Sequence, residues 1–129
     1  MSAQPLQRVL YVEDDEDVQR IVRVALERLG GMTLELVSDS SKAMEAIIDF
    51  KPDLVVLDWM MPRIDGLALF RKMRELPETA TLPVVFLTAH AHWSATDKLI
   101  ALGAAGVITK PFSATDLAEQ LRQIWKSLP

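Results

Sequence analysis

The chain has 129 residues, a formal net charge of −4 and no cysteine. That length fits one domain around a single hydrophobic core, and the lack of cysteine excludes disulfides and cysteine-built metal centres. An acidic chain is not expected to bind nucleic acid non-specifically, because such binding needs a basic face. No apolar run approaches the roughly 20 residues needed to cross a bilayer. None near the amino end predicts a signal peptide, so we expect a cytoplasmic protein that does not enter membranes.

The negative charge is concentrated in one segment. The five consecutive residues from Glu13 to Asp17 are all acidic, so the rest of the chain is close to neutral. The net charge is therefore a poor guide to the character of the surface as a whole.

Short runs rich in Val, Leu and Ile alternate with helical patterns along the chain. In chain order, the predicted elements are strand Val9–Val12, helix Asp17–Leu29, strand Thr33–Ser38, helix Ser41–Phe50, strand Leu54–Leu57, helix Gly66–Leu76, strand Val84–Leu87, a shorter helix near Ser94–Leu102, strand Val107–Thr109 and a last helix after Ser113. Ser113 and Asp116 predict a capping box for that last helix. Its apolar face is formed by Leu117, Leu121, Ile124 and Leu128.

Strands that alternate with helices predict a parallel sheet with helices on both faces. Three of the strands are apolar throughout, which is typical of strands buried on both sides. The predicted fold class is therefore α/β: a flavodoxin-like, doubly wound sheet of five parallel strands in the order 2-1-3-4-5, with five helices. In that order the first and third strands are neighbours.

Functional groups in such a sheet gather beyond the carboxyl ends of its strands. Glu13 and Asp14 follow the first strand and Asp58 follows the third, while Thr88 and Lys110 follow the fourth and fifth. Like charges about 4 Å apart repel by ~4 kcal/mol at an effective dielectric near 20, so three carboxylates need a cationic partner. Lys110 supplies one positive charge. A divalent ion with oxygen ligands would balance the rest, which favours Mg²⁺.

A plainer explanation exists for the acidic run, because acids at a helix N-terminus interact favourably with the helix dipole. It applies best to the last three acids of the run, of which Asp15 is the candidate cap. It applies poorly to Glu13 and Asp14 once the acid after the third strand is counted. Asp39 or Ser40, after the second strand, is expected to cap the helix that follows.

Asp58 is the most informative single residue, because a purely structural carboxylate directly after four apolar residues would be costly. Beside bound Mg²⁺, such a carboxylate can accept a phosphoryl group as an acyl phosphate. Thr88 and Lys110 could then bind the phosphoryl oxygens, and Ala89 leaves room for that group. Taken singly, Thr88 could instead satisfy backbone at the strand end and Lys110 could be a surface lysine. Their joint positions favour the site.

The loop after Asp58 runs from Met60 to Gly66. Pro62 and the Asp65-Gly66 pair predict turns that shape the loop. The backbone carbonyl of Met60 is expected to face the metal.

Together these residues resemble the receiver domain of two-component response regulators. The resemblance runs from about Arg8 to Leu128. Its segments, in order, are Val9–Asp15, Pro52–Asp58, Met61–Gly66, Leu82–Ala89 and Gly106–Phe112. Each segment alone is weak evidence, whereas their order and spacing together are specific. The expected organisation is an N-terminal tail, residues 1–8, followed by one receiver domain, residues 9–128.

The resemblance implies a role for each matching residue. The implied roles are phosphoacceptor for Asp58, direct Mg²⁺ ligand for Asp14, acid acting largely through metal-bound water for Glu13, backbone metal ligand for Met60, switch hydroxyl for Thr88 and phosphate-binding lysine for Lys110. The resemblance further implies a cis peptide bond between Lys110 and Pro111, against a base rate of roughly 5 to 6% for such bonds in folded proteins.

One position departs from the most familiar pattern of the family. Many receivers carry Tyr or Phe two residues into the fifth strand, where this chain has Val107. Phosphorylation is still expected to shift the face formed by the fourth helix, fifth strand and fifth helix, but not through an aromatic rotamer change. His90, His92 and Trp93 could substitute sterically. A solvent-exposed loop is the simpler explanation for them, and a His-x-His pair alone is weak evidence for a metal site.

The predicted function is a signalling switch. A phosphohistidine on a histidine kinase or a histidine phosphotransfer protein donates its phosphoryl group to Asp58, with Mg²⁺ as cofactor, and water later hydrolyses the acyl phosphate. Met60 and His90 flank the expected approach of that water, which makes them candidates for tuning the lifetime. The chain is thus expected to be a phosphoacceptor domain with at most slow self-catalysed phosphorylation and dephosphorylation, not an enzyme.

Two alternatives stay open. A small Mg²⁺-dependent phosphatase of the haloacid-dehalogenase type also uses a strand-end Asp, but it usually has a second Asp where this chain has Met60. A phosphorylation-independent interaction module would need no acidic pocket, yet all the expected side chains are present. We expect a monomer or a weak homodimer. The kinase, the output partner, and whether these residues are a whole regulator or part of a larger one stay open.

Overall fold

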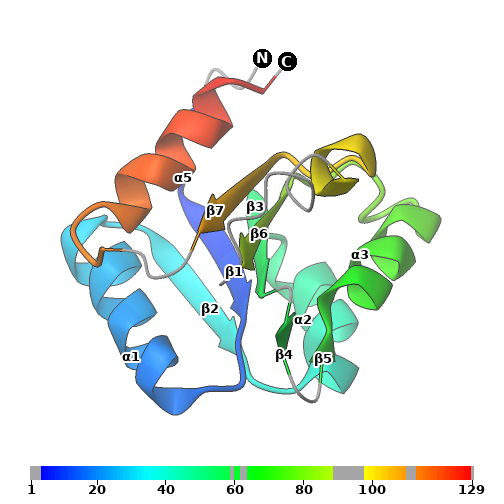
Figure 1. Ribbon diagram of the computed structural model, residues 1–129, viewed down its shortest axis with the longest axis horizontal. Helices are drawn as coiled ribbons and strands as arrows, with labels where there is room; N and C mark the ends of the chain where they lie inside the picture. The colour runs from blue at the N-terminus through cyan, green and yellow to red at the C-terminus, as the bar shows by residue number, and fades with distance from the viewer. Residues whose placement is uncertain (1–3, 59, 62–63, 89–97, 110–112, 129) are drawn as a thin grey trace.

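The computed structural model describes residues 4–58, 60–61, 64–88, 98–109 and 113–128. Its main sheet is formed by β1 (Arg8–Val12), β2 (Thr33–Val37), β3 (Leu54–Asp58), β6 (Val84–Thr88) and β7 (Gly106–Thr109). These strands are parallel to their neighbours and lie in the order β2-β1-β3-β6-β7 (Figure 1). Because β6 and β7 are the fourth and fifth of these strands along the chain, the predicted fold class and strand order are confirmed.

The register of the sheet determines which side chains meet at its carboxyl edge. Val12, the last residue of β1, pairs with Val37 of β2 and with Leu57 of β3. Asp58, the last residue of β3, pairs with Leu87 of β6. The residues that end β1 and β3 therefore lie side by side at the switch point of the topology, where open α/β sheets bind their ligands.

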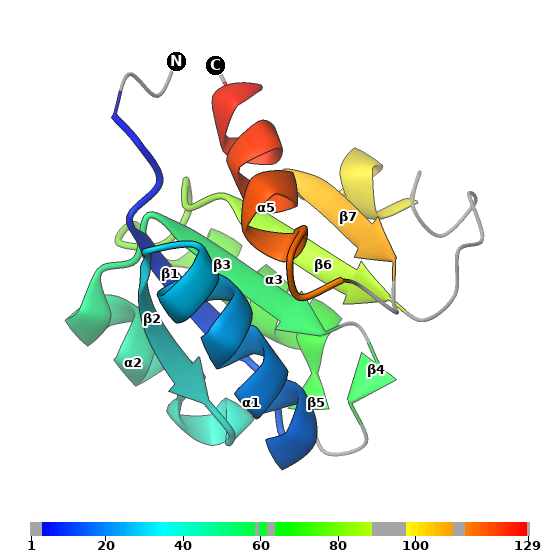
Figure 2. The same cartoon turned by 90° about the vertical axis from the view of Figure 1, so that its left-hand side faces the viewer.

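Helices cover both faces of the sheet. α1 (Glu16–Arg23), its π-helical continuation η1 (Val24–Leu29) and α5 (Leu117–Lys126) lie on one face (Figure 2). The 3-10 helix η2 (Ser40–Lys42), α2 (Ala43–Phe50) and α3 (Gly66–Glu75) lie on the other. Residues 98–101 are also helical, and the earlier part of the helix predicted near Ser94–Leu102 lies outside the described residues. Among the described residues, none of the helices is long and apolar enough to cross a bilayer.

Each face of the sheet has its own buried core. Side chains alternate along a strand, so Val9 and Tyr11 of β1 pack towards α1 and α5, whereas Leu10 and Val12 pack towards α2 and α3. On the second face, the rings of Phe70 and Phe86 meet edge to face with centroids 5.4 Å apart. Burial on both faces is the reason that β1, β3 and β6 are apolar over nearly their whole length.

The amino end of the chain packs more closely than a free tail would. Leu6 is buried in the core beneath α1 and α5, and the indole Nε1 of Trp125 donates a hydrogen bond to the carbonyl of Gln4 at 2.7 Å. Part of the segment 1–8 is therefore joined to α5 and to the sheet.

Three local features differ from the sequence prediction. The predicted helix Asp17–Leu29 is divided, because its second half is π-helical. In the loop after β3, the backbone forms a two-stranded antiparallel hairpin of β4 (Met60–Met61) and β5 (Ile64–Asp65), which the turn residues alone did not predict.

The third difference concerns the start of α5. The predicted capping box is not formed, because the Oγ of Ser113 accepts the backbone N–H of Thr115 at 3.3 Å and not that of Asp116. A turn thus precedes the helix, which begins at Leu117.

Candidate functional site

Two buried carboxylates lie at the carboxyl edge of the sheet. Glu13 directly follows β1 and is 2% exposed, and Asp58 ends β3 and is 3% exposed. They are the only charged side chains that are buried among the residues the structure describes. Burying an ionised carboxylate is costly unless charge or hydrogen bonds compensate it, so two of them on adjacent strands indicate a site that takes up positive charge.

The turn between β1 and α1 holds Glu13 in place. Its backbone N–H donates to the carbonyl of Val37 at 2.9 Å, which extends the β1–β2 ladder by one residue. Its carbonyl accepts the side-chain amide of Gln19 at 2.6 Å, and its Oε2 accepts the N–H of Asp15 at 3.3 Å. Gln19 was not identified from the sequence. A polar residue one turn into the helix, facing back to the strand end, was the available signal.

Burial decreases along the acidic run, and its last three acids belong to the start of α1. Asp14 is half-buried beside Glu13, whereas Asp15 and the two acids after it are exposed. Asp15 is the N-cap of α1, because its Oδ1 accepts the N–H groups of Asp17 at 2.8 Å and Val18 at 3.2 Å. The predicted cap is therefore confirmed.

The end of β6 also lies at this edge of the sheet. The backbone of Thr88 ends β6, and its register partner is Thr109 at the end of β7. Lys110 follows Thr109 directly and, with Pro111, lies outside the described residues, as do Ala89, His90, His92 and Trp93. The roles predicted for these residues and the cis Lys110-Pro111 bond stay predictions.

Met60 and Val107 are placed by their strands. The backbone of Met60 pairs with Asp65 in the β4–β5 hairpin, two residues after Asp58. Val107 is half-buried on β7, opposite Phe86, and packs against the core on the side of α2 and α3. A small branched side chain thus occupies the strand position at which an aromatic ring was expected in the family.

A buried phenol lies on β1, two residues before Glu13, and was missed from the sequence. Tyr11 is fully buried, and its hydroxyl makes no hydrogen bond with any described residue. An unpaired buried hydroxyl costs about 1–3 kcal/mol of stability. Burial, and after it the charges of Glu13 and Asp58, raises the pKa of this phenol well above its ordinary value. The hydroxyl therefore keeps its proton at neutral pH.

The donor set at this edge suits a hard divalent cation. Carboxylate oxygens, with a backbone carbonyl and water, are the ligands that Mg²⁺ prefers, and Glu13 and Asp58 present two carboxylates in a buried, acidic setting. Within the part of the chain that the structure describes, no three acidic or histidine side chains form a ready-made metal cluster.

Comparisons with known proteins agree on one family. The family model for the response regulator receiver domain matches residues 9–122. The phosphate regulon transcriptional regulatory protein PhoB of Pseudomonas aeruginosa is 34% identical over 116 residues, which cover 90% of this chain and 50% of PhoB. The response regulator MprA of Mycobacterium ulcerans is 37% identical over 117 residues, which cover 91% of this chain and 49% of MprA.

A solved structure supports the same fold. The response regulator from Desulfuromonas acetoxidans aligns with a TM-score of 0.84, over 95% of this chain and 99% of that one. Its sequence identity of 24% makes this a statement about the fold alone. The chain spans about half the length of the curated relatives that it matches.

Proposed function

The chain belongs to the response regulator receiver family, and on that basis we propose that Asp58 is the phosphoacceptor of a two-component phosphorelay. The observation that carries this proposal is the burial of Asp58 at the carboxyl end of β3, beside the buried Glu13 on the neighbouring strand. The phosphoryl donor is a phosphohistidine on a histidine kinase or on a histidine phosphotransfer protein. We place the reaction in the cytoplasm, in a monomer or a weak homodimer, and we assign residues 9–128 to the receiver domain and residues 1–8 to a tail that precedes it.

The transfer replaces one bond to phosphorus with another. A carboxylate oxygen of Asp58 attacks in line, the phosphorus–nitrogen bond of the phosphohistidine breaks, and the imidazole leaves with that electron pair and takes up a proton. Thr88 and Lys110 hydrogen-bond the phosphoryl oxygens, and the small Ala89 leaves space for them. Water later attacks the phosphorus, which releases inorganic phosphate and restores the carboxylate.

Mg²⁺ is the expected cofactor. The carboxylates of Glu13, Asp14 and Asp58 and the carbonyl of Met60 would hold it, Glu13 largely through water. When bound, it offsets the negative charge that spreads over the transferred phosphoryl oxygens. Without it, the same carboxylates repel an incoming phosphoryl group, so phosphorylation should require the metal.

The output of the switch is a change in shape at the face formed by the fourth helix, β7 and α5. Val107 has no aromatic ring whose movement could signal phosphorylation. We therefore expect the strand ends near Thr88 to transmit the change in shape. Met60 and His90 are proposed to set the lifetime of the acyl phosphate, because we expect them to flank the approach of water. A downstream protein or domain would read the changed face.

The test is the intact mass of the protein after incubation with Mg²⁺ and acetyl phosphate. We expect a gain of one phosphoryl group that disappears in Asp58→Asn and in the presence of EDTA. Asp49→Asn is the matched control, because Asp49 is an exposed acid on α2, away from the site. Replacing Met60 and His90 together should change the rate at which the added mass is lost.

Three results would contradict the proposal. Phosphorylation that survives in Asp58→Asn would place the acceptor elsewhere. Failure of the unaltered chain to bind Mg²⁺ or to gain mass would favour an interaction module that does not depend on phosphorylation. Steady turnover of an external phosphoester would favour the phosphatase.

A further inference from the structure

The protein buries two hydroxyl groups in very different settings. The Oγ1 of Thr79, which is 1% exposed, donates to the carbonyl of Met73 at 2.6 Å. The hydroxyl of Tyr11 has no hydrogen-bond partner among the described residues, although the whole residue is inaccessible to solvent. Phenylalanine would fill the same space without an unpaired polar atom. The hydroxyl of Tyr11 therefore calls for an explanation that the core does not provide.

The register of the sheet places this phenol on the same face as the two carboxylates. Side chains two residues apart lie on the same face of a strand, so Tyr11 shares a face with Glu13, and its β3 partner Val56 shares that face with Asp58. Residues two apart are separated by about 6.6 Å along a strand, so the side chains of Tyr11 and Glu13 are neighbours on that face.

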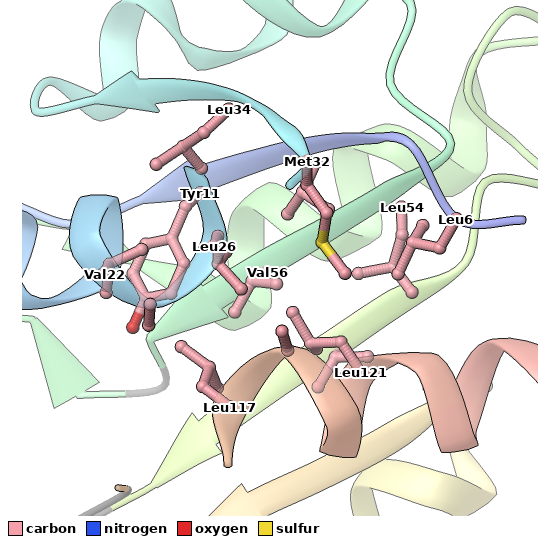
Figure 3. Packing of buried hydrophobic residues seen from close by; sticks show 14 of the residues in the cluster. Leu6, Tyr11, Val22, Leu26, Met32, Leu34, Leu54, Val56, Leu117 and Leu121 are labelled. Carbon is pink, nitrogen blue, oxygen red and sulfur yellow. The ribbon is translucent and has the colours of Figure 1, made fainter. Parts of the chain in front are cut away.

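Apolar side chains surround the ring of Tyr11. Figure 3 shows the ring of Tyr11 close to Val22 of α1 and Leu117 of α5, with its oxygen at the end of the ring that points away from the strand. These neighbours are apolar and offer no hydrogen bond. Burial raises the pKa of this phenol most, and the charges of Glu13 and Asp58 add to the rise, in keeping with their positions on the same face of the sheet.

We infer that Tyr11 is a positioning residue of the acidic pocket, whose hydroxyl donates a hydrogen bond to the Glu13 carboxylate when the pocket takes up a divalent cation. This inference rests on the proposed function, because it assumes that the cation is bound there. The hydroxyl is unpaired in the metal-free protein and paired in the metal-bound protein, so it favours the bound arrangement. Its contribution is to hold Glu13, and it does not touch the phosphoryl group.

We expect Tyr11→Phe to raise stability in the absence of metal and to lower the affinity for Mg²⁺. Tyr11→Phe removes a buried hydroxyl that has no partner, so the metal-free protein should become more stable, with its unfolding midpoint in EDTA higher by roughly 3 °C. The same change removes the donor that Glu13 uses in the bound state. The dissociation constant for Mg²⁺ should therefore rise about threefold or more.

The test compares Tyr11→Phe with Thr79→Val in the full chain. Mg²⁺ affinity is measured by calorimetric titration and stability by thermal unfolding in EDTA. Thr79→Val removes a buried hydroxyl that is paired and lies away from the site, so it should destabilise the protein and leave Mg²⁺ affinity unchanged. A rise of threefold or more in the dissociation constant of Tyr11→Phe, with no change in Thr79→Val, supports the inference. A smaller rise overturns it.

A second measurement needs no variant. The chain has one tyrosine, so labelling with ¹³C at the ring carbon that bears the hydroxyl gives a single resonance. Addition of Mg²⁺ should shift this resonance in the unaltered protein and not in Asp58→Asn. If calorimetry shows Mg²⁺ binding while the resonance stays in place, the role of Tyr11 is wrong and the proposed function survives. If the unaltered chain binds no Mg²⁺, the proposed function itself fails.

Discussion

Charged side chains at the two edges of the sheet are used in different ways. At the amino edge, the Oδ2 of Asp53 accepts the backbone N–H groups of Gln7 at 3.1 Å and Arg8 at 2.9 Å. Arg74 donates to the carbonyls of Leu82 at 2.9 Å and Gly103 at 3.3 Å, and its guanidinium lies 4.5 Å from the ring centre of Phe70. At the carboxyl edge, Glu13 and Asp58 are instead almost completely buried and lie next to each other at the ends of adjacent strands.

The charges of Asp53 and Arg74 stabilise the fold, whereas we expect those of Glu13 and Asp58 to destabilise it. Asp53 and Arg74 join segments distant in sequence, and both stay partly accessible to water, which lowers the desolvation cost. Glu13 and Asp58 carry like charges into a buried setting, an arrangement that selection for stability alone would remove. We therefore expect the carboxyl edge to be the functional edge, and substitutions of its buried acids should change stability in the opposite direction to substitutions at the amino edge.

Asp53→Ala should have the largest effect. It removes the acceptor of two backbone N–H groups at the entrance to β1, which should lower the free energy of unfolding by about 2 kcal/mol. Urea denaturation measures the change, and Asp49→Ala, at an exposed position on α2, is the control. Phosphorylation of the folded variant should be unaffected. Equal losses in the two variants would show that the bonds at Asp53 add nothing to stability.

Asp58→Asn should have a smaller effect of the opposite sign. The amide keeps the shape of the side chain and removes one of two neighbouring buried charges, so the free energy of unfolding in EDTA should rise by about 1 kcal/mol. Saturating Mg²⁺ should reverse the ranking, because the metal stabilises only the protein that binds it. Urea denaturation with and without Mg²⁺ checks both statements. A loss of stability in EDTA would mean that Asp58 supports the fold as Asp53 does.

Most of the fold could be predicted from the sequence because parallel topology leaves few choices. Once β1 and β3 are recognised as buried strands, their adjacency at the switch point follows, and so does the meeting of Glu13 with Asp58. The acidic run could be divided for a similar reason, since Asp15 has the side chain and position of a helix cap. These inferences depend on chain order and residue type, which the sequence contains.

The features that escaped prediction depend on packing in three dimensions. In the sequence, Tyr11 is one of several large residues expected in a buried strand. Its proposed role in holding Glu13 depends on the register, which places its ring on the same face as the carboxylates. The π-helical turns of η1 lie where this segment packs against β2 and α5. The β4–β5 hairpin is a local pairing that the turn residues alone did not specify. Ser113 and Asp116 have the spacing of a capping box, but the turn before α5 gives the Ser113 hydroxyl a nearer partner in Thr115.

Asp39 tests whether the edge of the sheet or burial decides the effect of a carboxylate on stability. It lies at the carboxyl edge, but like Asp53 it accepts hydrogen bonds from nearby donors. It follows β2, is exposed, and its Oδ1 accepts both the hydroxyl of Ser41 at 2.8 Å and the N–H of Ser41 at 2.9 Å. These two hydrogen bonds lower the pKa of Asp39 below its ordinary value, and the bond from the Ser41 hydroxyl has the larger effect. If burial, and not the edge itself, makes a carboxylate destabilising, then Asp39 should stabilise the fold.

Asp39→Ala should therefore lower stability slightly, and in a manner that depends on pH. A carboxyl group whose pKa is lower in the folded state stabilises the fold above its unfolded pKa of about 3.9 and loses that contribution as the pH falls through the folded value. Unfolding in urea at pH 6 should thus separate the variant from the unaltered protein, and the gap should close towards pH 3. Ser41→Ala should reproduce part of the effect, because it removes the hydroxyl donor. A gap that is the same at both pH values would mean that the charge of Asp39 does not act through these bonds.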